Sequence, residues 1–401
     1  MSSISLAVRG TSIRLSRGTD GSIGSCRIDT VSEAGLYCPA PSPPTLMPMA
    51  CSSSPDYFLP HIARMEGYVP GEQPRQRQLV KLNTNENPFP PSPLVLERLR
   101  AACGQQLRRY PDSQSVGVRT RLADLFQIPP EQILVGNGSD ELLNVALRCF
   151  AGAGDRVVVP DPTYPYYEKL IQLQDAVQVR VAFPEDFSMP PDLPVAGARV
   201  TVIANPNSPS GTLLPTESLA RLAAETEGVL IIDEAYVDFA AGGAVHLARD
   251  FANVVVCRTM SKSFSLAGMR IGFCFGPPAL IAGMGKVKEH YNLSMLSQVA
   301  AEAALDDIAT MRANADRIRG TRTDLTAGLE KLGFHVWESA ANFVLGRMAS
   351  PPASALYRGL KERGVLVRYF DRSRLADCLR ITVGTDEEIA VLLRELTELL
   401  S

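Results

Sequence analysis

The stretch Arg258-Thr-Met-Ser-Lys-Ser-Phe-Ser-Leu-Ala-Gly-Met-Arg-Ile-Gly272 links two apolar runs and carries one lysine. Short apolar runs predict buried strands, so the stretch is predicted to be a loop between two strands. Lys262 is flanked by Ser261 and Ser263, and Arg270 follows on the same loop. A neutral lysine amine can form a Schiff base with an aldehyde, and hydroxyls with an arginine can hold a phosphate. The stretch therefore predicts a site for pyridoxal phosphate (PLP), with a solvated surface loop as the alternative.

The composition of the 401-residue chain permits a large core, since 45% of its residues are hydrophobic. Such a length suggests two domains, or one large domain with an appendage. The net charge of −3 does not indicate nucleic acid or an anionic membrane surface as a partner. No apolar run approaches the roughly 20 residues that span a bilayer. We therefore expect small-molecule partners.

Cysteine and histidine usage gives no sign of a metal site. The eight cysteines form no C-x-x-C pair, and the four histidines are scattered along the chain. Cys257 and Cys274 lie inside apolar runs. They are predicted to be reduced core thiols in a non-oxidising compartment.

Residues 1–54 differ in composition from the rest of the chain. They are rich in Ser, Thr, Gly and Pro and contain four arginines, no lysine and three acidic residues. This pattern is typical of an organelle transit peptide, most of all a chloroplast one. The alternative is a disordered tail on a cytoplasmic protein. Residues 57–93 are predicted to form an irregular arm, because Asn, Pro and Gly are too dense there for regular structure.

From residue 133 onward, apolar strands alternate with helices, which predicts an α/β domain with a mostly parallel sheet of about seven strands. A long helical region at 298–332 precedes a smaller α+β block that ends in a helix at 386–400, with Thr385 as its cap. The predicted division is a disordered or transit segment (1–54), an arm and the start of the small domain (55–106), a PLP-binding large domain (107–332) and a small C-terminal domain (333–401). The predicted strands are 133–135, 157–159, 177–181, 200–203, 229–232, 254–257 and 271–275.

Four predicted strand ends carry polar or aromatic residues, and a parallel sheet presents its ligand sites at such ends. Gly136-Asn-Gly-Ser-Asp-Glu141 could bind an anion at a helix start, although this motif alone favours an ordinary helix cap by Ser139 or Asp140. Tyr164 could stack on a flat ring, and Asn205-Pro-Asn-Ser-Pro-Ser-Gly211 could present amides or be a simple turn. Asp233 ends a buried strand and needs a cationic partner, either Mg²⁺ or a protonated pyridine nitrogen. The absence of a phosphate-binding G-x-x-x-x-G-K-[ST] loop favours the pyridine.

In this order the motifs resemble those of the fold-type I PLP-dependent aminotransferases and, among them, the histidinol-phosphate aminotransferase family. The resemblance covers about residues 62–400. It rests on the motifs Gly67-Tyr-Val-Pro-Gly71, Leu82-Asn-Thr-Asn-Glu-Asn-Pro88, Arg109-Tyr-Pro111, Gly136-Asn-Gly-Ser-Asp-Glu-Leu142, Asp233-Glu-Ala-Tyr236, Ser261-Lys-Ser-Phe-Ser-Leu-Ala-Gly268 and Leu379-Arg-Ile-Thr-Val-Gly384.

The resemblance implies that Lys262 forms the Schiff base, Asp233 keeps the pyridine nitrogen protonated and Tyr236 bonds the ring oxygen. The family commonly has asparagine directly before the Pro-Thr-Gly of its turn. This position is Ser208 here, which leaves Asn207 or Ser208 to contact the ring, and we expect Asn207. The residues implied to hold the cofactor are Lys262, Gly138, Ser139, Tyr164, Asn207, Asp233, Tyr236, Ser261, Arg270 and Tyr110.

The resemblance also implies a homodimer with shared active sites, in which Tyr110 and Tyr68 reach into the partner's site. Arg380 would bind the anionic end of both substrates, because its planar fork suits carboxylate and phosphate alike. The substrate-binding residues implied are Arg380, Arg368, Tyr68 and Asn85.

The implied reaction is a two-half, ping-pong transamination between L-histidinol phosphate and 2-oxoglutarate. Its products are imidazole-acetol phosphate and L-glutamate, as in histidine biosynthesis. An aromatic amino acid aminotransferase and a threonine-phosphate decarboxylase-like enzyme stay open as alternatives, since both use the same lysine. A non-catalytic PLP carrier is disfavoured because the lysine is intact.

Overall fold

The computed structural model describes residues 5–8, 11–14, 57–68, 71–73 and 79–401. The chain forms two units, Met1–Tyr57 and Phe58–Ser401, and each is described by itself. In the first unit, β1 (Ser5–Val8) and β2 (Thr11–Arg14) pair antiparallel. The remainder of the predicted transit segment 1–54 lies outside the described residues.

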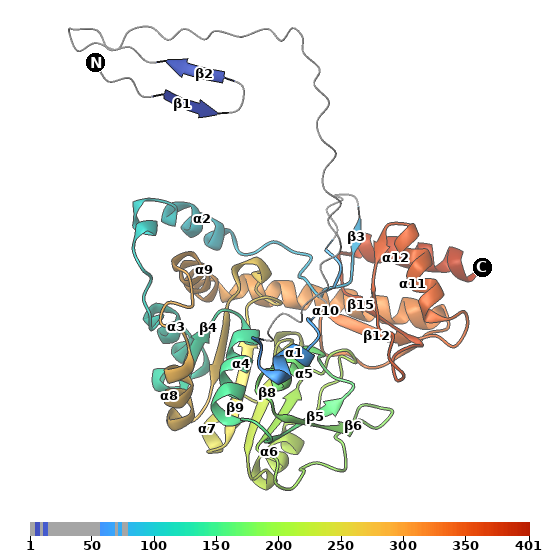
Figure 1. Cartoon of the computed structure of the whole chain (residues 1–401). Helices are drawn as coiled ribbons and strands as arrows, with labels where there is room; N and C mark the ends of the chain where they lie inside the picture. Colours follow the sequence, from blue (N-terminus) through green and yellow to red (C-terminus); the bar gives the residue numbers. More distant parts are fainter. Residues whose placement is uncertain (1–4, 9–10, 15–56, 69–70, 74–78) are drawn as a thin grey trace, which may run out of the picture. The chain divides into compact units, whose positions relative to one another are not determined.

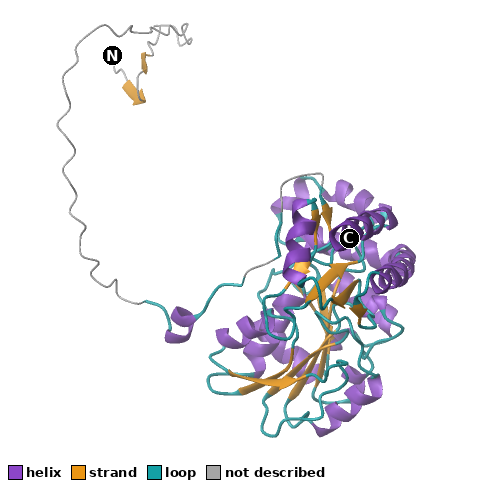
Figure 2. Ribbon diagram, turned by 90° about the vertical axis from the view of Figure 1, so that its right-hand side faces the viewer, coloured by secondary structure: helices purple, strands orange, loops and turns teal. Residues whose placement is uncertain are grey.

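The second unit contains a seven-stranded sheet in the order β4-β10-β9-β8-β7-β5-β6 (Figures 1 and 2). Only β10 runs antiparallel to its neighbours. The prediction of a mostly parallel α/β sheet is therefore confirmed, and each predicted strand is present. The strands are β4 (Ile133–Gly136), β5 (Arg156–Asp161), β6 (Val177–Ala182), β7 (Val200–Ala204), β8 (Val229–Asp233), β9 (Val254–Thr259) and β10 (Gly272–Phe275).

Helices cover both faces of this sheet, and alternate strand residues point to opposite faces. Ile232 packs in the core beneath one helical layer, whereas Ile231 packs beneath the other. The first layer contains α3 (Val116–Phe126), α6 (Thr216–Glu225), α7 (Leu247–Asp250) and α9 (Met295–Asp306). The second contains α4 (Ser139–Phe150), α5 (Tyr166–Leu173) and α8 (Pro278–Val287). Burial on both faces explains the continuous apolar strands.

The carboxyl-terminal region contains a four-stranded antiparallel sheet covered by helices. Its strands, in spatial order, are β11 (His335–Val336), β12 (Phe343–Arg347), β15 (Cys378–Thr382) and β14 (Arg368–Tyr369). They pack with α10 (Ile308–Lys331), α11 (Ala353–Glu362) and α12 (Asp386–Leu400). Thr385 caps α12 in a capping box with Glu388, as the sequence predicted.

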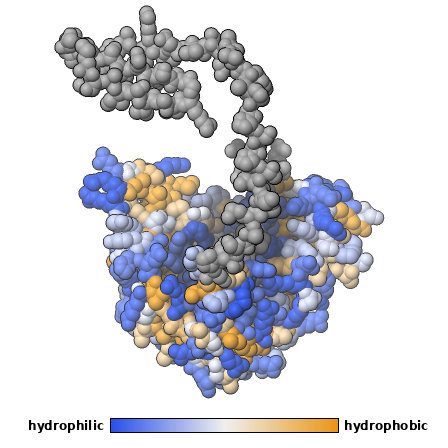
Figure 3. All heavy atoms as spheres, viewed as in Figure 1, coloured by the Kyte–Doolittle hydropathy of each residue, from blue (hydrophilic) through white to orange (hydrophobic). Residues whose placement is uncertain are grey.

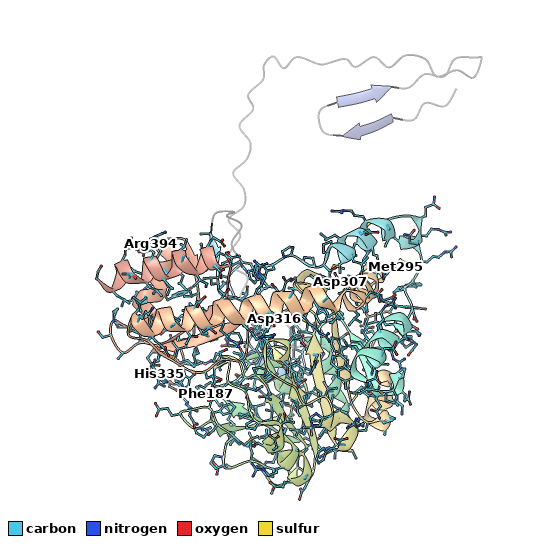
Figure 4. The ribbon with its side chains drawn as sticks, turned by 180° about the vertical axis from the view of Figure 1, so that it is seen from behind. Phe187, Met295, Asp307, Asp316, His335 and Arg394 are labelled. Atoms are coloured by element: carbon cyan, nitrogen blue, oxygen red, sulfur yellow. The ribbon has the colours of Figure 1, made fainter. Side chains whose placement is uncertain are left out.

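The long helical region is interrupted at Asp307, which separates α9 from α10 (Figure 4). The hydroxyls of Ser92 and Thr310 both donate to the Asp307 carboxylate and hold it at this break. From there α10 reaches the second core, where Ile318, Leu325 and Leu329 are buried. The helix therefore packs in both hydrophobic cores. The proposed domain boundary at residue 332 assigns all of α10 to the large domain, although the helix also belongs to the core of the small one.

The arm is more regular than the sequence indicated. It contains α1 (Pro60–Arg64) and β3 (Val80–Lys81), and β3 pairs in parallel with β13 (Val365–Leu366). The sequence pattern also predicts a strand at 365–367, which corresponds to β13. It pairs with the arm, whereas the neighbouring β14 pairs with β15. The sequence pattern predicts a helix at about 93–107, and the structure has α2 (Pro93–Ala102) there, followed by a 3₁₀ turn. The short 3₁₀ turns are Gln105–Arg108, Pro130–Gln132, Val237–Phe239 and Ala267–Met269.

Among the described residues, no helix combines the length and the apolar character that a membrane crossing requires. Cys257 and Cys274 face one another on β9 and β10 as buried, free thiols.

Candidate active site

The carboxyl ends of β4, β5, β7, β8 and β9 meet at one edge of the large sheet, and a pocket of about 170 Å³ opens there. Its wall also includes residues from the arm and from the small sheet. Eleven of the fourteen predicted site residues line it: Tyr68, Asn85, Ser139, Tyr164, Asp233, Tyr236, Ser261, Lys262, Arg270, Arg368 and Arg380. The three that do not are Gly138, Asn207 and Tyr110.

Lys262 follows β9 on a loop that the arm holds in place. Its Nζ donates to the backbone oxygen of Thr84 at 3.3 Å and lies 5.8 Å from the centre of the Tyr236 ring. The side-chain amide of Asn87 donates to the backbone oxygens of Lys262 (3.0 Å) and Ser263 (3.1 Å). The amine therefore points into the pocket from an anchored backbone, and the alternative of a solvated surface loop is wrong.

Asp233 ends β8 as a buried carboxylate without a cationic partner among the contacts of its side chain. Tyr167 donates its hydroxyl to Oδ2 at 2.6 Å, and the backbone N–H of Ala235 donates to Oδ1 at 3.1 Å. Burial raises the pKa of Asp233 to about 6, against the opposing effect of the Tyr167 hydrogen bond. Such a group gains from a cation placed beside it.

The start of α4 forms a small polar cradle with Arg270. Gly138 precedes the helix with φ of 87°, and a Cβ there would lie 2.7 Å from Arg270 Nη2. Arg270 donates to Ser261 Oγ and to Asp140 Oδ2, each at 3.3 Å. The predicted alternative, a side-chain cap from Ser139 or Asp140, is wrong, since Ser139 is the first helical residue and Gly138 the capping position. Ser261 Oγ and the N-terminus of α4, where Ser139 is the first residue, thus lie beside the Arg270 guanidinium, and this is a suitable place for a phosphate.

The turn after β7 differs from the expectation that Asn207 contacts a ring. The Asn207 amide donates to Pro162 O and Ser210 Oγ and accepts from the Thr163 hydroxyl. It therefore stabilises the turn, and Ser208 lines the pocket in its place. Ser208 also accepts a hydrogen bond from Arg380 at 3.2 Å. Ser208, the next residue in sequence, is therefore the one that faces the pocket.

Arg368 and Arg380 lie directly opposite each other on the antiparallel strands β14 and β15. Arg380 donates to Asn83 O (3.0 Å) and Ser208 Oγ, while its Nε has no partner within the described part of the chain. Burial, and to a lesser extent Arg368, lowers the pKa of Arg380. Two like charges opposite each other in a sheet are unfavourable. The pair therefore creates a strong preference for an anion in the pocket.

The two tyrosines expected to act across a dimer lie in different surroundings. Tyr68 lines the pocket of its own chain and lies edge-on to Tyr166 at 5.3 Å. Its expected contribution to a partner's site stays a prediction. Tyr110 is 78% exposed and stacks on Tyr291 at 4.4 Å, outside the pocket.

Asn85 lies in the pocket wall, and both polar atoms of its side-chain amide form hydrogen bonds within the protein. Nδ2 donates to the Tyr236 hydroxyl at 3.0 Å, and Oδ1 accepts from the Thr382 hydroxyl at 3.0 Å. Its amide thus contacts Tyr236 and Thr382, and the expected substrate contact stays a prediction. Tyr164 is placed as predicted in the wall, edge-on to Tyr167 at 5.4 Å.

Sequence reasoning missed several wall residues, among them Tyr167, Asp140, Thr84 and Phe370. Tyr167 had a usable signal, because it stands one helical turn after Tyr164 and so faces the same side. Thr84 contributes through its backbone oxygen, which no side-chain pattern can indicate.

Comparison with known proteins agrees with this geometry. Residues 77–396 match the family described as aminotransferase class I and II. Histidinol-phosphate aminotransferase 1 of Trichormus variabilis is 44% identical over 347 residues, which cover 86% of this chain and 99% of that protein. Histidinol-phosphate aminotransferase of Geobacter sp. is 44% identical over 84% of this chain and 97% of that protein. The crystal structure of histidinol-phosphate aminotransferase from Sinorhizobium meliloti, in complex with pyridoxal-5′-phosphate, superposes with a TM-score of 0.80 at 28% identity, over 87% of this chain and 98% of that one.

The fold and the lysine-bearing pocket thus define a class I and II aminotransferase. More narrowly, the chain belongs to the histidinol-phosphate aminotransferase family, with 41–45% identity to such enzymes over most of its length. The family expected from the sequence motifs is confirmed.

Proposed function

We propose that this protein uses PLP to transfer an amino group between L-histidinol phosphate and 2-oxoglutarate, as in histidine biosynthesis. The observation that carries the proposal is the pair of arginines, Arg368 and Arg380, opposite each other in a pocket that also contains Lys262. Both donor and acceptor of this reaction are anionic, and a phosphate ester satisfies two guanidinium groups better than a single carboxylate does.

The residues present fit PLP. Asp233 is a buried carboxylate that lacks a cation and would hold the protonated pyridine nitrogen. Ser139, Ser261 and Arg270 would hold the phosphate at the start of α4, where only glycine at position 138 leaves room for the guanidinium. When bound, PLP supplies the aldehyde for the Schiff base and a ring that withdraws electrons from the substrate.

The chain's own residues then have distinct roles. Lys262 Nζ would hold the cofactor and act as the base that removes the proton from the substrate α carbon. Tyr236 would donate its hydroxyl to the ring oxygen, and Tyr164 would pack on the ring face. Arg380 would bind the anionic end of either substrate, with Arg368 and Tyr68 added for the phosphate ester.

A homodimer is part of the proposal. Figure 3 shows hydrophobic residues exposed in the region of α2, the helix that carries the exposed Leu96. Leu107, Val116 and the stacked pair Tyr110 and Tyr291 are exposed as well. Monomers rarely expose such patches, so a second copy would cover this one and bring Tyr110 to the partner's phosphate site. Sedimentation of the purified protein, with and without a Tyr110→Asp substitution, tests this part.

Targeting to a plastid is the remaining part of the proposal. It is supported by the composition of residues 1–54, which contain Arg9, Arg14, Arg17 and Arg27 and no lysine. Fusion of residues 1–54 to a fluorescent reporter in plant or algal cells tests it, with a fusion of residues 58–401 as the control.

The central experiment is a substrate screen on the purified PLP-loaded protein, followed through the change in cofactor absorbance. We expect turnover with histidinol phosphate to exceed turnover with phenylalanine by at least tenfold, and no release of CO₂ from threonine phosphate. Lys262→Ala should abolish transamination, and full turnover by that variant would refute the assignment. Faster reaction with phenylalanine would favour an aromatic aminotransferase.

A further inference from the structure

We infer that Asn85 is a positioning residue, whose side-chain amide aims the Tyr236 hydroxyl at the oxygen of the cofactor ring. The inference rests on the role proposed for Tyr236 and adds the group on which that role depends. Asn85 is 1% exposed and comes from the arm, 151 residues before Tyr236 in the chain.

The hydrogen bonds around Asn85 fix the orientation of its amide. The backbone N–H of Asn85 donates to Thr382 Oγ1 at 3.0 Å, so this hydroxyl must direct its own proton elsewhere. It directs that proton to Asn85 Oδ1, also at 3.0 Å. Because Oδ1 is thereby assigned as the acceptor, Nδ2 is the group left to face Tyr236. Asn342 holds the same backbone from the other side by donating to Asn85 O at 3.0 Å.

The consequence for Tyr236 is a one-way hydrogen bond. Its oxygen accepts from Asn85 Nδ2 at 3.0 Å, so its single proton is free to be donated to another group. Its ring is held edge-on to Phe343 at 4.9 Å, which limits rotation of the side chain. A phenol that accepts a hydrogen bond from an amide is also a better donor, since the bonds polarise one another. Asn85 thus presents Tyr236 to the pocket as a donor.

The backbone conformation suits an asparagine at this position. Asn85 has φ of 56°, in the left-handed region that asparagine and aspartate tolerate better than most side chains. Glycine and aspartate are therefore available as test substitutions without added backbone strain. Asn85→Gly removes the amide. Asn85→Asp keeps its shape and the bond from Thr382 but replaces the donor that faces Tyr236 with an acceptor.

The experiment measures the pKa of the Schiff base between Lys262 and PLP, by absorbance across a pH series. A donor to the ring oxygen lowers this pKa, because it stabilises the oxygen anion at the expense of the neighbouring proton. Tyr236→Phe should raise it, and Asn85→Asp should raise it nearly as much, since Tyr236 would then donate to the new carboxylate. Asn85→Gly should raise it by a smaller amount, of roughly one pKa unit or less. The PLP dissociation constant of each variant gives a second readout.

The decisive comparison is the double variant. In the Tyr236→Phe background, neither Asn85 substitution should move the Schiff-base pKa further, because Asn85 acts through the missing hydroxyl. An equal shift in both backgrounds would overturn the inference, since it would reveal a direct effect of charge or packing. No shift from Asn85→Asp or Asn85→Gly with Tyr236 intact would overturn it as well. No shift from Tyr236→Phe alone would instead refute the role proposed for Tyr236.

Two substitutions at Thr382, which lies outside the pocket wall, test the inference even if the Asn85 variants fail to fold. Thr382→Val removes the hydroxyl that orients the Asn85 amide, whereas Thr382→Ser keeps it. The valine variant should shift the Schiff-base pKa upward and the serine variant should leave it unchanged. Equal values for the two would count against the inference.

Discussion

The hydroxyl of Tyr167 donates to Asp233 Oδ2 at 2.6 Å, and both side chains are buried. This bond stabilises the charged form of a carboxylate whose burial favours the neutral form, so the two effects oppose each other in the ligand-free protein. A pyridinium nitrogen beside Asp233 would complete the arrangement.

Tyr167→Phe should weaken cofactor binding. Loss of the bond disfavours the charged carboxylate that holds the pyridinium, and a hydrogen bond to a charged group contributes enough for a rise of about tenfold in the PLP dissociation constant. Absorbance titration with PLP measures it. Tyr166→Phe is the matched control, because Tyr166 is the neighbour on α5 and does not line the pocket. Equal affinities of the two variants would contradict the prediction.

Asp233→Asn should change how the stability of the cofactor-free protein depends on pH. The pKa of Asp233 is raised from 3.8 to about 6, so its stabilising contribution is complete below pH 3.8 and is lost as the pH rises through 6. The loss amounts to about 3 kcal/mol. Thermal unfolding at pH 4.5 and at pH 7 measures it: the unfolding temperature should fall more between these two pH values in the unsubstituted protein than in Asp233→Asn. An identical decline in Asp233→Asn would disprove the assignment, and we expect this variant to have lost transamination.

Glu234→Gln should destabilise the large sheet behind the pocket. Arg258 donates to Oε2 of Glu234 through both Nε (2.8 Å) and Nη2 (2.7 Å), and the Glu234 side chain is fully buried. Neutralising Glu234 leaves the largely buried Arg258 with only the more distant Asp238 carboxylate (3.6 Å) among its described ion-pair partners, at a cost of about 3 kcal/mol. Urea unfolding measures it. The exposed pair Arg249–Asp250 provides the control, since Arg249→Ala should cost well under 1 kcal/mol.

Arg368→Ala and Arg380→Ala should separate the two substrates. In the proposed function Arg380 binds the anionic end of both substrates, so its loss should raise KM for glutamate and for histidinol phosphate. Arg368 is proposed as the second arginine, which a phosphate ester would use and a carboxylate would not need. We expect Arg368→Ala to raise KM for histidinol phosphate by about tenfold and to leave KM for glutamate within twofold. Steady-state kinetics of both half-reactions measure these KM values. An equal rise in KM for the two substrates in Arg368→Ala would count against this division of roles.

Thr385→Ala should lower stability without altering catalysis. At the start of α12, the Glu388 N–H donates to the Thr385 hydroxyl, and the Thr385 N–H donates to the Glu388 carboxylate. Loss of such a cap costs about 1 kcal/mol. Chemical denaturation should show this loss with kcat unchanged. A changed kcat would indicate that α12 acts on the pocket.

Local patterns were enough to predict the strands of the large sheet, the helix at 386–400 and the presence of Lys262 and Asp233 in the pocket. Each of these depends on neighbours in sequence: a buried strand is a short apolar run, and a ligand residue follows its end. The arm was predicted poorly, because β3 (Val80–Lys81) exists only through its pairing with β13, about 285 residues away. The sequence also could not decide between Asn207 and Ser208. Which of the two side chains faces the pocket depends on the backbone conformation of the folded turn.

The sequence by itself determined the class of fold, the lysine loop and the acidic strand end, because short-range periodicity and residue chemistry encode them. Only the tertiary structure decided the pairs that set the properties of the site. Arg368 faces Arg380 through strand register, Asn85 reaches Tyr236 across 151 residues, and Tyr167 meets Asp233 across 66. Such contacts depend on how distant segments pack against one another, and no local pattern along the chain specifies that packing.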